Sequence, residues 1–235
     1  MKQTFILLII GASLLLGNVI TSFAQNMQKG MDLAERGDYA AAFREWHPLA
    51  EEGQAKAQYF LGWVYENGRG VVQDYEEAVK WYHKAAEQGY ALALNNLGLA
   101  YSDGRGVTQD HVETVKWLRK AAFKGNAKAQ YNLGLIYNNG QGVARDHKEA
   151  VKWYSKAAEQ EHISAQYNLG VLFATGKGIK QDNVYAHMWL NIAASQGDLD
   201  AIQVRDTVAK WMTSEDIRKA QELAQRCVQK KLKLC

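Results

Sequence analysis

The feature that most restricts this chain is a pattern that returns every 36 residues. A Leu-Gly pair occurs at 61, 97, 133 and 169, and each pair is followed by a Gly-x-Gly turn, first at Gly68 and Gly70. An aspartate, a tryptophan and an Ala-Ala pair come next in the same order, first as Asp74, Trp81 and Ala85. Four copies in phase predict a stack of similar units, in which each unit buries its apolar face against its neighbours.

Each copy is predicted to fold as helix, turn, helix. In the first copy Ala57, Leu61 and Tyr65 fall on one face of a helix. Gly62 lies beside that face, and a glycine inside a helix costs about 1 kcal/mol relative to alanine. Its return in every copy predicts that a second helix approaches closely there, with the large Trp81 packed against the small residues.

The turn between the two helices carries its own signals. Gly68 is expected to end the first helix in the left-handed conformation. Asp74 is expected to cap the second helix, with Glu77 three residues later as its capping-box partner. Second helices end at glycine in three copies, and Glu161 stands at that position in the third copy. The end of that helix is therefore expected to be strained or to extend further.

The flanks of the array divide the chain into segments. Residues 54–197 hold the four copies, and residues 25–53 form a degenerate first copy with a shorter turn. Residues 198–235 are predicted to form two helices that cap the last copy, because an array must hide its final apolar face. Residues 1–24 resemble a signal peptide, with Lys2, an apolar run and a cleavage site after Ala24. This predicts a periplasmic or secreted protein; an uncleaved membrane anchor is the alternative.

Charge and motifs exclude several classes of function. The net charge of +3 indicates neither a nucleic-acid partner nor, apart from the leader segment, a membrane partner. The chain has no S-x-x-K, G-x-S-x-G or H-E-x-x-H motif, so no catalytic residue and no metal site are predicted. The 20 glycines are all taken up by the leader and the repeats, which leaves none for a phosphate loop, and no cofactor is expected.

The stretch from Ala129 to Val143, followed by Asp146, Trp153 and Ala157, resembles the Sel1-like repeat. That family is a relative of the tetratricopeptide repeat with a longer turn inside the repeat, and the short first copy resembles the tetratricopeptide repeat itself. The resemblance implies an all-α fold, a right-handed α-solenoid of helix–turn–helix repeats with a C-terminal helical cap. It also implies a binding or scaffold role.

In such a solenoid the first helices line the concave face. Mapping by resemblance gives a set of residues expected to contact a peptide: Tyr59, Trp63, Asn95, Asn96, Leu99, Tyr131, Asn132, Leu135, Tyr167 and Asn168. Asparagine side chains offer donors and an acceptor to the backbone of an extended peptide. Alternatively, each asparagine bonds a neighbouring helix and fixes the stacking of the repeats.

Three functions stay open at this point. The first is an exported scaffold or adaptor that binds a protein or peptide partner. The second is a cell-wall-active or β-lactamase-like hydrolase, although this chain lacks the cysteine pair in each repeat of the relatives discussed in that connection. The third is a structural spacer in an envelope complex. The partner and the oligomeric state are not specified by the sequence.

The two cysteines lie at the C-terminus. An exported chain meets conditions in which Cys227 and Cys235 can form a disulfide. Residues eight apart in one helix are separated by about 12 Å of rise, which is beyond disulfide reach. The bond therefore requires the helix to end near Gln229 and the tail to fold back. Intermolecular pairing and free thiols are the alternatives.

Overall fold

The computed structural model describes residues 24–232, and every regular element in that range is a helix. The helices are residues 24–35, α2 (Tyr39–Glu51), α3 (Ala55–Asn67), α4 (Tyr75–Glu87), α5 (Ala91–Asp103), α6 (His111–Phe123), α7 (Ala127–Asn139), α8 (His147–Ala158), α9 (Ile163–Thr175), α10 (Asn183–Ser195), α11 (Leu199–Ala209) and α12 (Ser214–Gln229). The prediction of an all-α fold is confirmed for this part of the chain.

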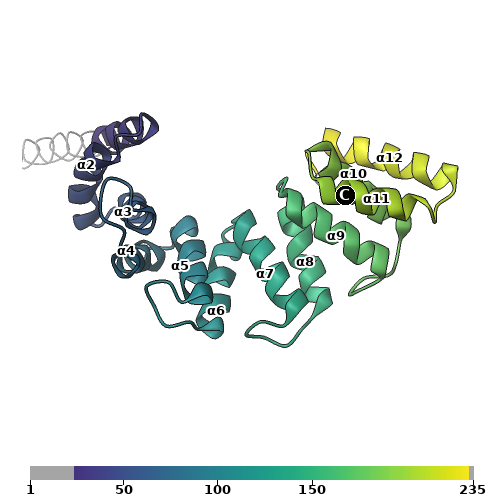
Figure 1. Ribbon diagram of the computed structural model, residues 1–235, viewed down its shortest axis with the longest axis horizontal. Coiled ribbons are helices and arrows are strands. Elements are labelled where there is room, and N and C mark those ends of the chain that lie inside the picture. The colour runs from purple at the N-terminus through teal and green to yellow at the C-terminus, as the bar shows by residue number, and fades with distance from the viewer. Residues whose placement is uncertain (1–23, 233–235) are drawn as a thin grey trace, which may run out of the picture. The chain divides into compact units, whose positions relative to one another are not determined.

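The described residues form two compact units. Unit 1 holds the residues up to Ala93 together with Gly104–Thr108, and unit 2 holds Leu94–Asp103 and the residues from Gln109 onward. In unit 1, α3 packs on α2 and α4. In unit 2, the helices from α6 to α10 each pack on the next, and α10 also packs on α11 and α12 (Figure 1). This is the helix-pair packing of an α-solenoid.

The mid-helix glycines admit a side chain from the second helix, but that side chain is not the tryptophan. A Cβ added to Gly62 would lie 2.6 Å from Cδ1 of Tyr82. The same position faces the residue after the tryptophan in the other copies: Leu118, Tyr154 and Leu190. The prediction that Trp81 packs into this recess is therefore wrong. The tryptophans are buried as well but do not face these glycines, and Lys84 Nζ lies 3.9 Å from the Trp81 ring centroid.

Both glycines of each turn have a structural reason, and the second one joins successive repeats. Gly68 ends α3 with a left-handed φ of 61°, as predicted. Gly70 has φ 75°, and its missing side chain allows the turn to lie against the backbone of Tyr39 and Ala40 at the start of α2. In unit 2, Gly142 lies in the same way against His111 at the start of α6.

Aspartates cap the second helices as predicted. The side chain of Asp74 accepts from the backbone N–H of Glu77 at 2.9 Å. The predicted capping box is wrong, because the backbone N–H of Asp74 donates to the carbonyl of Tyr65 at 3.0 Å instead. The Glu77 carboxylate accepts from Lys80 one turn further along the helix.

The third copy ends its second helix without glycine. Helix α8 stops at Ala158, so it does not extend. Glu161 adopts the left-handed conformation with φ 64°, where Gly89 and Gly125 have φ 77° and 86° in their copies. A side chain in this region of backbone space is strained, in agreement with the first of the two predicted outcomes.

A glutamine bridge that was not predicted ties successive helices together. Gln130 Nε2 donates to the carbonyl of Ala122 in α6 at 3.1 Å, and its Oε1 accepts from Gln160 at 2.7 Å. The same bridge is made by Gln58 with Gln88 and by Gln166 with Gln196. The second copy has Leu94 and Lys124 at these two positions, so both partners are lost together. That pairing was visible in the sequence.

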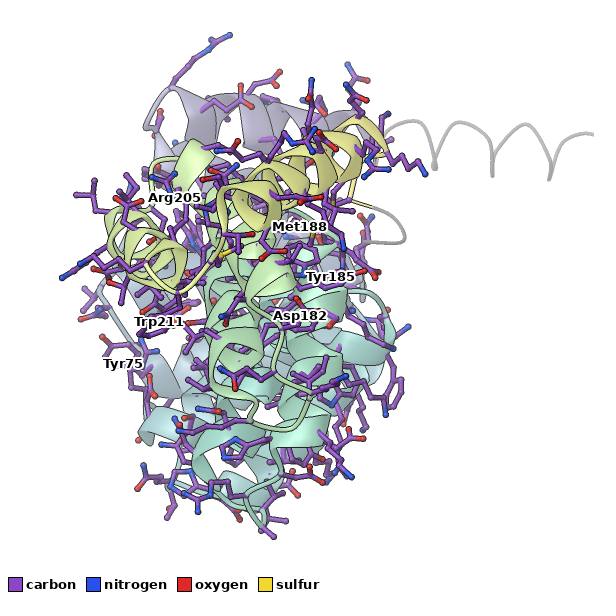
Figure 2. All side chains as sticks on the ribbon, turned by 90° about the vertical axis from the view of Figure 1, so that its right-hand side faces the viewer. Tyr75, Asp182, Tyr185, Met188, Arg205 and Trp211 are labelled. Carbon is purple, nitrogen blue, oxygen red and sulfur yellow. The ribbon has the colours of Figure 1, made fainter. Side chains whose placement is uncertain are left out.

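Helices on either side of the four copies complete the described part of the chain. Gly30 of helix 24–35 lies against the indole of Trp46 in α2, and Pro48 is accommodated inside that helix. Helices α11 and α12 follow the last copy, with Asp198 and Thr213 as their caps. Figure 2 shows this end of the chain, where Asp182 and Tyr185 mark the start of α10 and Met188 follows in the same helix.

Two predictions on the termini fall largely outside the described residues. The leader segment lies there except for Ala24, which begins helix 24–35. Cys235 lies there too, so its bond to Cys227 stays a prediction. One of its two requirements is met, because α12 ends at Gln229. Lys231 and Leu232 then take left-handed φ values of 52° and 58°. Within residues 24–232, no helix is both long and apolar enough to span a bilayer.

Candidate functional site

The predicted contact residues of unit 2 lie on the first helices of three copies, α5, α7 and α9. Most of them are partly exposed, and we call this group the first-helix surface: Asn96, Leu99, Tyr131, Asn132, Leu135, Tyr167 and Asn168. The fixed repeat length places side chains of the same kind on successive helices. A surface made of amide, phenol and aliphatic groups is thereby presented to the solvent.

Asn95 differs from the other predicted contact residues, because it is only 4% exposed. Its Nδ2 donates to Asn96 at 3.2 Å, and its Oδ1 accepts from Asn132 of α7 at 3.4 Å. Asn95 therefore joins α5 to α7 from within, which is the alternative role considered for the asparagines. Its side chain is not presented to a ligand in this conformation.

The three asparagines of the 96, 132 and 168 column are not equivalent. Asn96 and Asn132 both contact Asn95. Asn168 is partly exposed, and its carboxamide makes no hydrogen bond within residues 24–232. Since a carboxamide offers two donor hydrogens and one acceptor oxygen, Asn168 has its full capacity available to a ligand.

Aromatic side chains support the middle of the first-helix surface. The ring of Tyr131 stacks on His162 with centroids 4.5 Å apart, and it lies 5.9 Å from the ring of Tyr154. Burial raises the pKa of the Tyr154 hydroxyl and lowers the pKa of the His162 imidazole. Both groups are therefore neutral near pH 7, and they form an uncharged floor beneath Tyr131.

The first helices of unit 2 carry almost no charge. Asp103 and Lys128 are the only charged side chains in α5, α7 and α9. Asp103 lies at the end of α5, whereas Lys128 lies one helical turn before Asn132 in α7 and its charge helps to lower the pKa of His162. A ligand on this surface would meet mainly hydrogen-bonding and apolar groups.

Unit 1 places the other two predicted contact residues, Tyr59 and Trp63, on α3. Both line a cavity of about 310 Å³ between helix 24–35, α2 and α3. The remaining walls are Met31, Ala34, Glu35, Tyr39, Trp46 and Phe60. The sequence did not indicate this cavity, because five of its wall residues belong to the degenerate copy, whose packing the repeat pattern leaves undefined.

The acidic, histidine and cysteine side chains of the described residues are dispersed over both units. Among residues 24–232, no three or more histidine, cysteine, aspartate or glutamate side chains are grouped so that they could hold a metal ion. His147 Nδ1 lies 3.1 Å from Oδ1 of Asn138, while His111 is exposed at the start of α6. The features that can act chemically are thus a polar surface and an apolar cavity, both suited to binding.

Comparisons with known proteins agree with this description. The model of the Sel1 repeat matches residues 55–90, 91–126, 127–162 and 163–198. The structure is similar to c5321, a protective antigen of uropathogenic Escherichia coli with an SLR fold, at 32% identity and TM-score 0.78. The match covers 92% of this chain but 48% of c5321, so the chain spans about half of that protein.

A Sel1 repeat protein from Oxalobacter formigenes is similar over most of both chains. The identity is 31% and the TM-score 0.73, with 85% of this chain and 84% of the other covered. A second similar structure, from Klebsiella pneumoniae, has 23% identity and TM-score 0.53 and bears on the fold alone. No curated protein sequence matches significantly.

Proposed function

We propose that this chain, which belongs to the Sel1 repeat family, is an exported scaffold that binds a protein or peptide partner through its first helices. Sel1 repeats are generally protein-interaction scaffolds and are generally not enzymes. Our proposal adds that the partner binds the first-helix surface. The observation that carries it is the set of partly exposed amide and aromatic side chains on α5, α7 and α9, with Asn168 free to bond.

Export is supported by the leader pattern in residues 1–24, and the two cysteines near the C-terminus agree with it because an exported chain can keep a disulfide. A protein that works outside the cytoplasm has little access to ATP or to cellular reductants. A binding function that consumes neither ATP nor reductant agrees with a location outside the cytoplasm.

The low number of charges near the first-helix surface, with Lys128 beside Asn132 and Asp198 and Asp200 near Tyr167, bears on the kind of partner. Salt screens the attraction between exposed charges but has little effect on buried amide and apolar contacts. Binding there should therefore change little between low and high salt. An extended peptide, whose backbone offers donors and acceptors in alternation, matches the amide groups on successive helices.

A photo-crosslinking residue placed at Leu135 tests this proposal in the native cell. Leu135 lies on the first-helix surface, and Phe123, at the end of α6, is the matched control because it is exposed outside that surface. A partner adduct from position 135 but not from 123 is expected. That adduct should be lost when Asn168 is changed to alanine in the same chain, with an unchanged melting temperature.

Adducts that form from position 123 alone would show that another surface binds the partner. They would favour the spacer alternative. Turnover of a β-lactam or of a cell-wall fragment by the purified protein, lost after one point substitution, would instead support the hydrolase alternative.

A further inference from the structure

We propose that the cavity of unit 1 is an anchor pocket for one aromatic side chain of a partner polypeptide. This inference rests on the proposed function and deepens it, because it assigns the partner residue that the scaffold selects. Of the predicted contact residues, Tyr59 and Trp63 face this cavity. The remaining wall residues had no assigned role.

The size of the cavity suits a single side chain. Its volume of about 310 Å³ lies at the lower end of the range of about 300–1,000 Å³ typical of ligand pockets. Met31 and Ala34 of helix 24–35 form one wall, and α2 and α3 form the others. Such a space has room for one large side chain of a polypeptide.

The walls favour a ring over an aliphatic chain. Tyr39 and Trp63 have ring centroids 5.7 Å apart at 47°, and Tyr59 and Phe60 have centroids 5.3 Å apart at 65°. Trp46 stacks on Phe60 at 4.7 Å. Rings in these arrangements present edges and faces to a further ring, and an entering ring gains from edge-to-face or offset contacts beyond its buried area.

The charges around the cavity select an uncharged occupant. Glu35 is the only wall residue with a carboxylate, and it is exposed to solvent. Two cations lie against the same walls: Arg69 donates to the Tyr39 hydroxyl at 2.8 Å, and Lys56 Nζ lies 3.1 Å from Sδ of Met31. The two cations outnumber the single carboxylate, so a basic anchor gains nothing from the local field. An acidic anchor would have to leave its hydration shell for the apolar walls of Met31, Ala34 and Phe60, which is costly for a charged group.

Pentapeptides of sequence acetyl-Gly-Ser-X-Ser-Gly-amide test the pocket directly, with X as Phe, Leu, Arg, Asp or Ala. Binding to the purified protein is followed through the indole N–H signals of Trp46 and Trp63 in nitrogen-15 NMR spectra. We expect the Phe peptide to bind about fivefold more tightly than the Leu peptide. It should bind at least about tenfold more tightly than the other three, which corresponds to about 1.4 kcal/mol.

Two variants and a control locate the effect. Ala34→Leu fills the cavity and should weaken binding of the Phe peptide about tenfold, whereas Ala144→Leu, an exposed position in a unit 2 turn, should leave it unchanged. Glu35→Gln should change it less than about twofold. Melting temperatures of all variants confirm that each one folds.

Tighter binding of the Arg peptide, or loss of binding in Glu35→Gln, would overturn the proposal in favour of a cation site. Equal binding of all five peptides, or no binding at all, would overturn it as well. None of these results bears on the crosslinks from Leu135, which test the first-helix surface of unit 2. Failure of the pocket and failure of the scaffold function are therefore distinguishable.

Discussion

The hydroxyl of Tyr82 donates to the Glu66 carboxylate at 2.6 Å while its ring lies over Gly62, so one helix holds the tyrosine of the next at both ends. Glu66 also accepts from Arg105 at 3.3 Å. The Tyr82 ring cannot move away from Gly62 without breaking its hydrogen bond to Glu66. The packing of α3 on α4 is thus fixed by a missing side chain as well as by those present.

Gly62→Ala is expected to lower the free energy of unfolding by about 1–3 kcal/mol, because the new methyl group overlaps the Tyr82 ring. Helix propensity alone predicts the opposite sign, a gain of about 1 kcal/mol. Urea denaturation measures the outcome. In a Tyr82→Ala background the same substitution should be neutral or stabilising; an equal loss in both backgrounds would disprove the overlap.

Gln130→Leu is expected to cost about 0.5–1.5 kcal/mol, because it removes two hydrogen bonds while the Ala122 carbonyl keeps the N–H of Gly125 and Gln160 keeps the carbonyl of Lys156. The second copy has a different compatible pair, because Leu94 and Lys124 stand at the positions equivalent to Gln130 and Gln160. The double variant Gln130→Leu with Gln160→Lys should recover part of the loss. Chemical denaturation of both variants tests this, and a double variant less stable than the single one would contradict it.

Glu161→Gly is expected to stabilise the protein by about 0.5–1 kcal/mol. Glycine relieves the left-handed strain of about 1–2 kcal/mol, and its greater freedom in the unfolded chain offsets part of the gain. Gly125→Ala, at the same position of the second copy, is the control and should destabilise. Thermal unfolding of the two variants should give shifts of opposite sign.

The stability of unit 2 is expected to fall as the pH drops below about 6.5. His187 is 4% exposed, and burial, together with Arg205, lowers the pKa of its imidazole. The unfolded chain therefore takes up a proton at a pH where the folded chain does not, so stability is full above 6.5 and is lost through the lowered pKa. His162 contributes in the same direction.

Melting temperatures between pH 7.5 and 5.0 measure this dependence. His187→Gln should flatten the curve. A variant curve parallel to the unsubstituted one would rule out His187 as the source.

The repeat predicted the helices, their caps and their glycine ends well, because these depend on residues within one copy. It failed where the outcome depends on geometry between helices. The spacing of Trp81 and Tyr82 could not show which ring faces Gly62, since both lie on the buried side of α4. The capping box failed because Tyr65 offers a competing backbone acceptor from another helix.

The candidate site shows the same division. The sequence placed the asparagines on the first helices, but it could not distinguish Asn95 from Asn96, because adjacent helical positions differ by only about 100° in direction. One is buried and bonded on both sides, and the other is partly exposed. The cavity of unit 1 had no signal in the repeat pattern.

The second glycine of each turn gives the array a direction of growth. Gly70 needs the start of α2 to lie against, and α2 belongs to a copy that has no Gly-x-Gly turn of its own. The turn of a following copy can therefore pack on α2 of the degenerate copy. The degenerate copy has no such turn with which to pack on a copy before it. Duplication or loss of a whole 36-residue segment inside the array preserves every such contact, whereas insertion of a few residues breaks one. Related proteins should consequently differ in length by whole repeats, gained or lost after the degenerate copy.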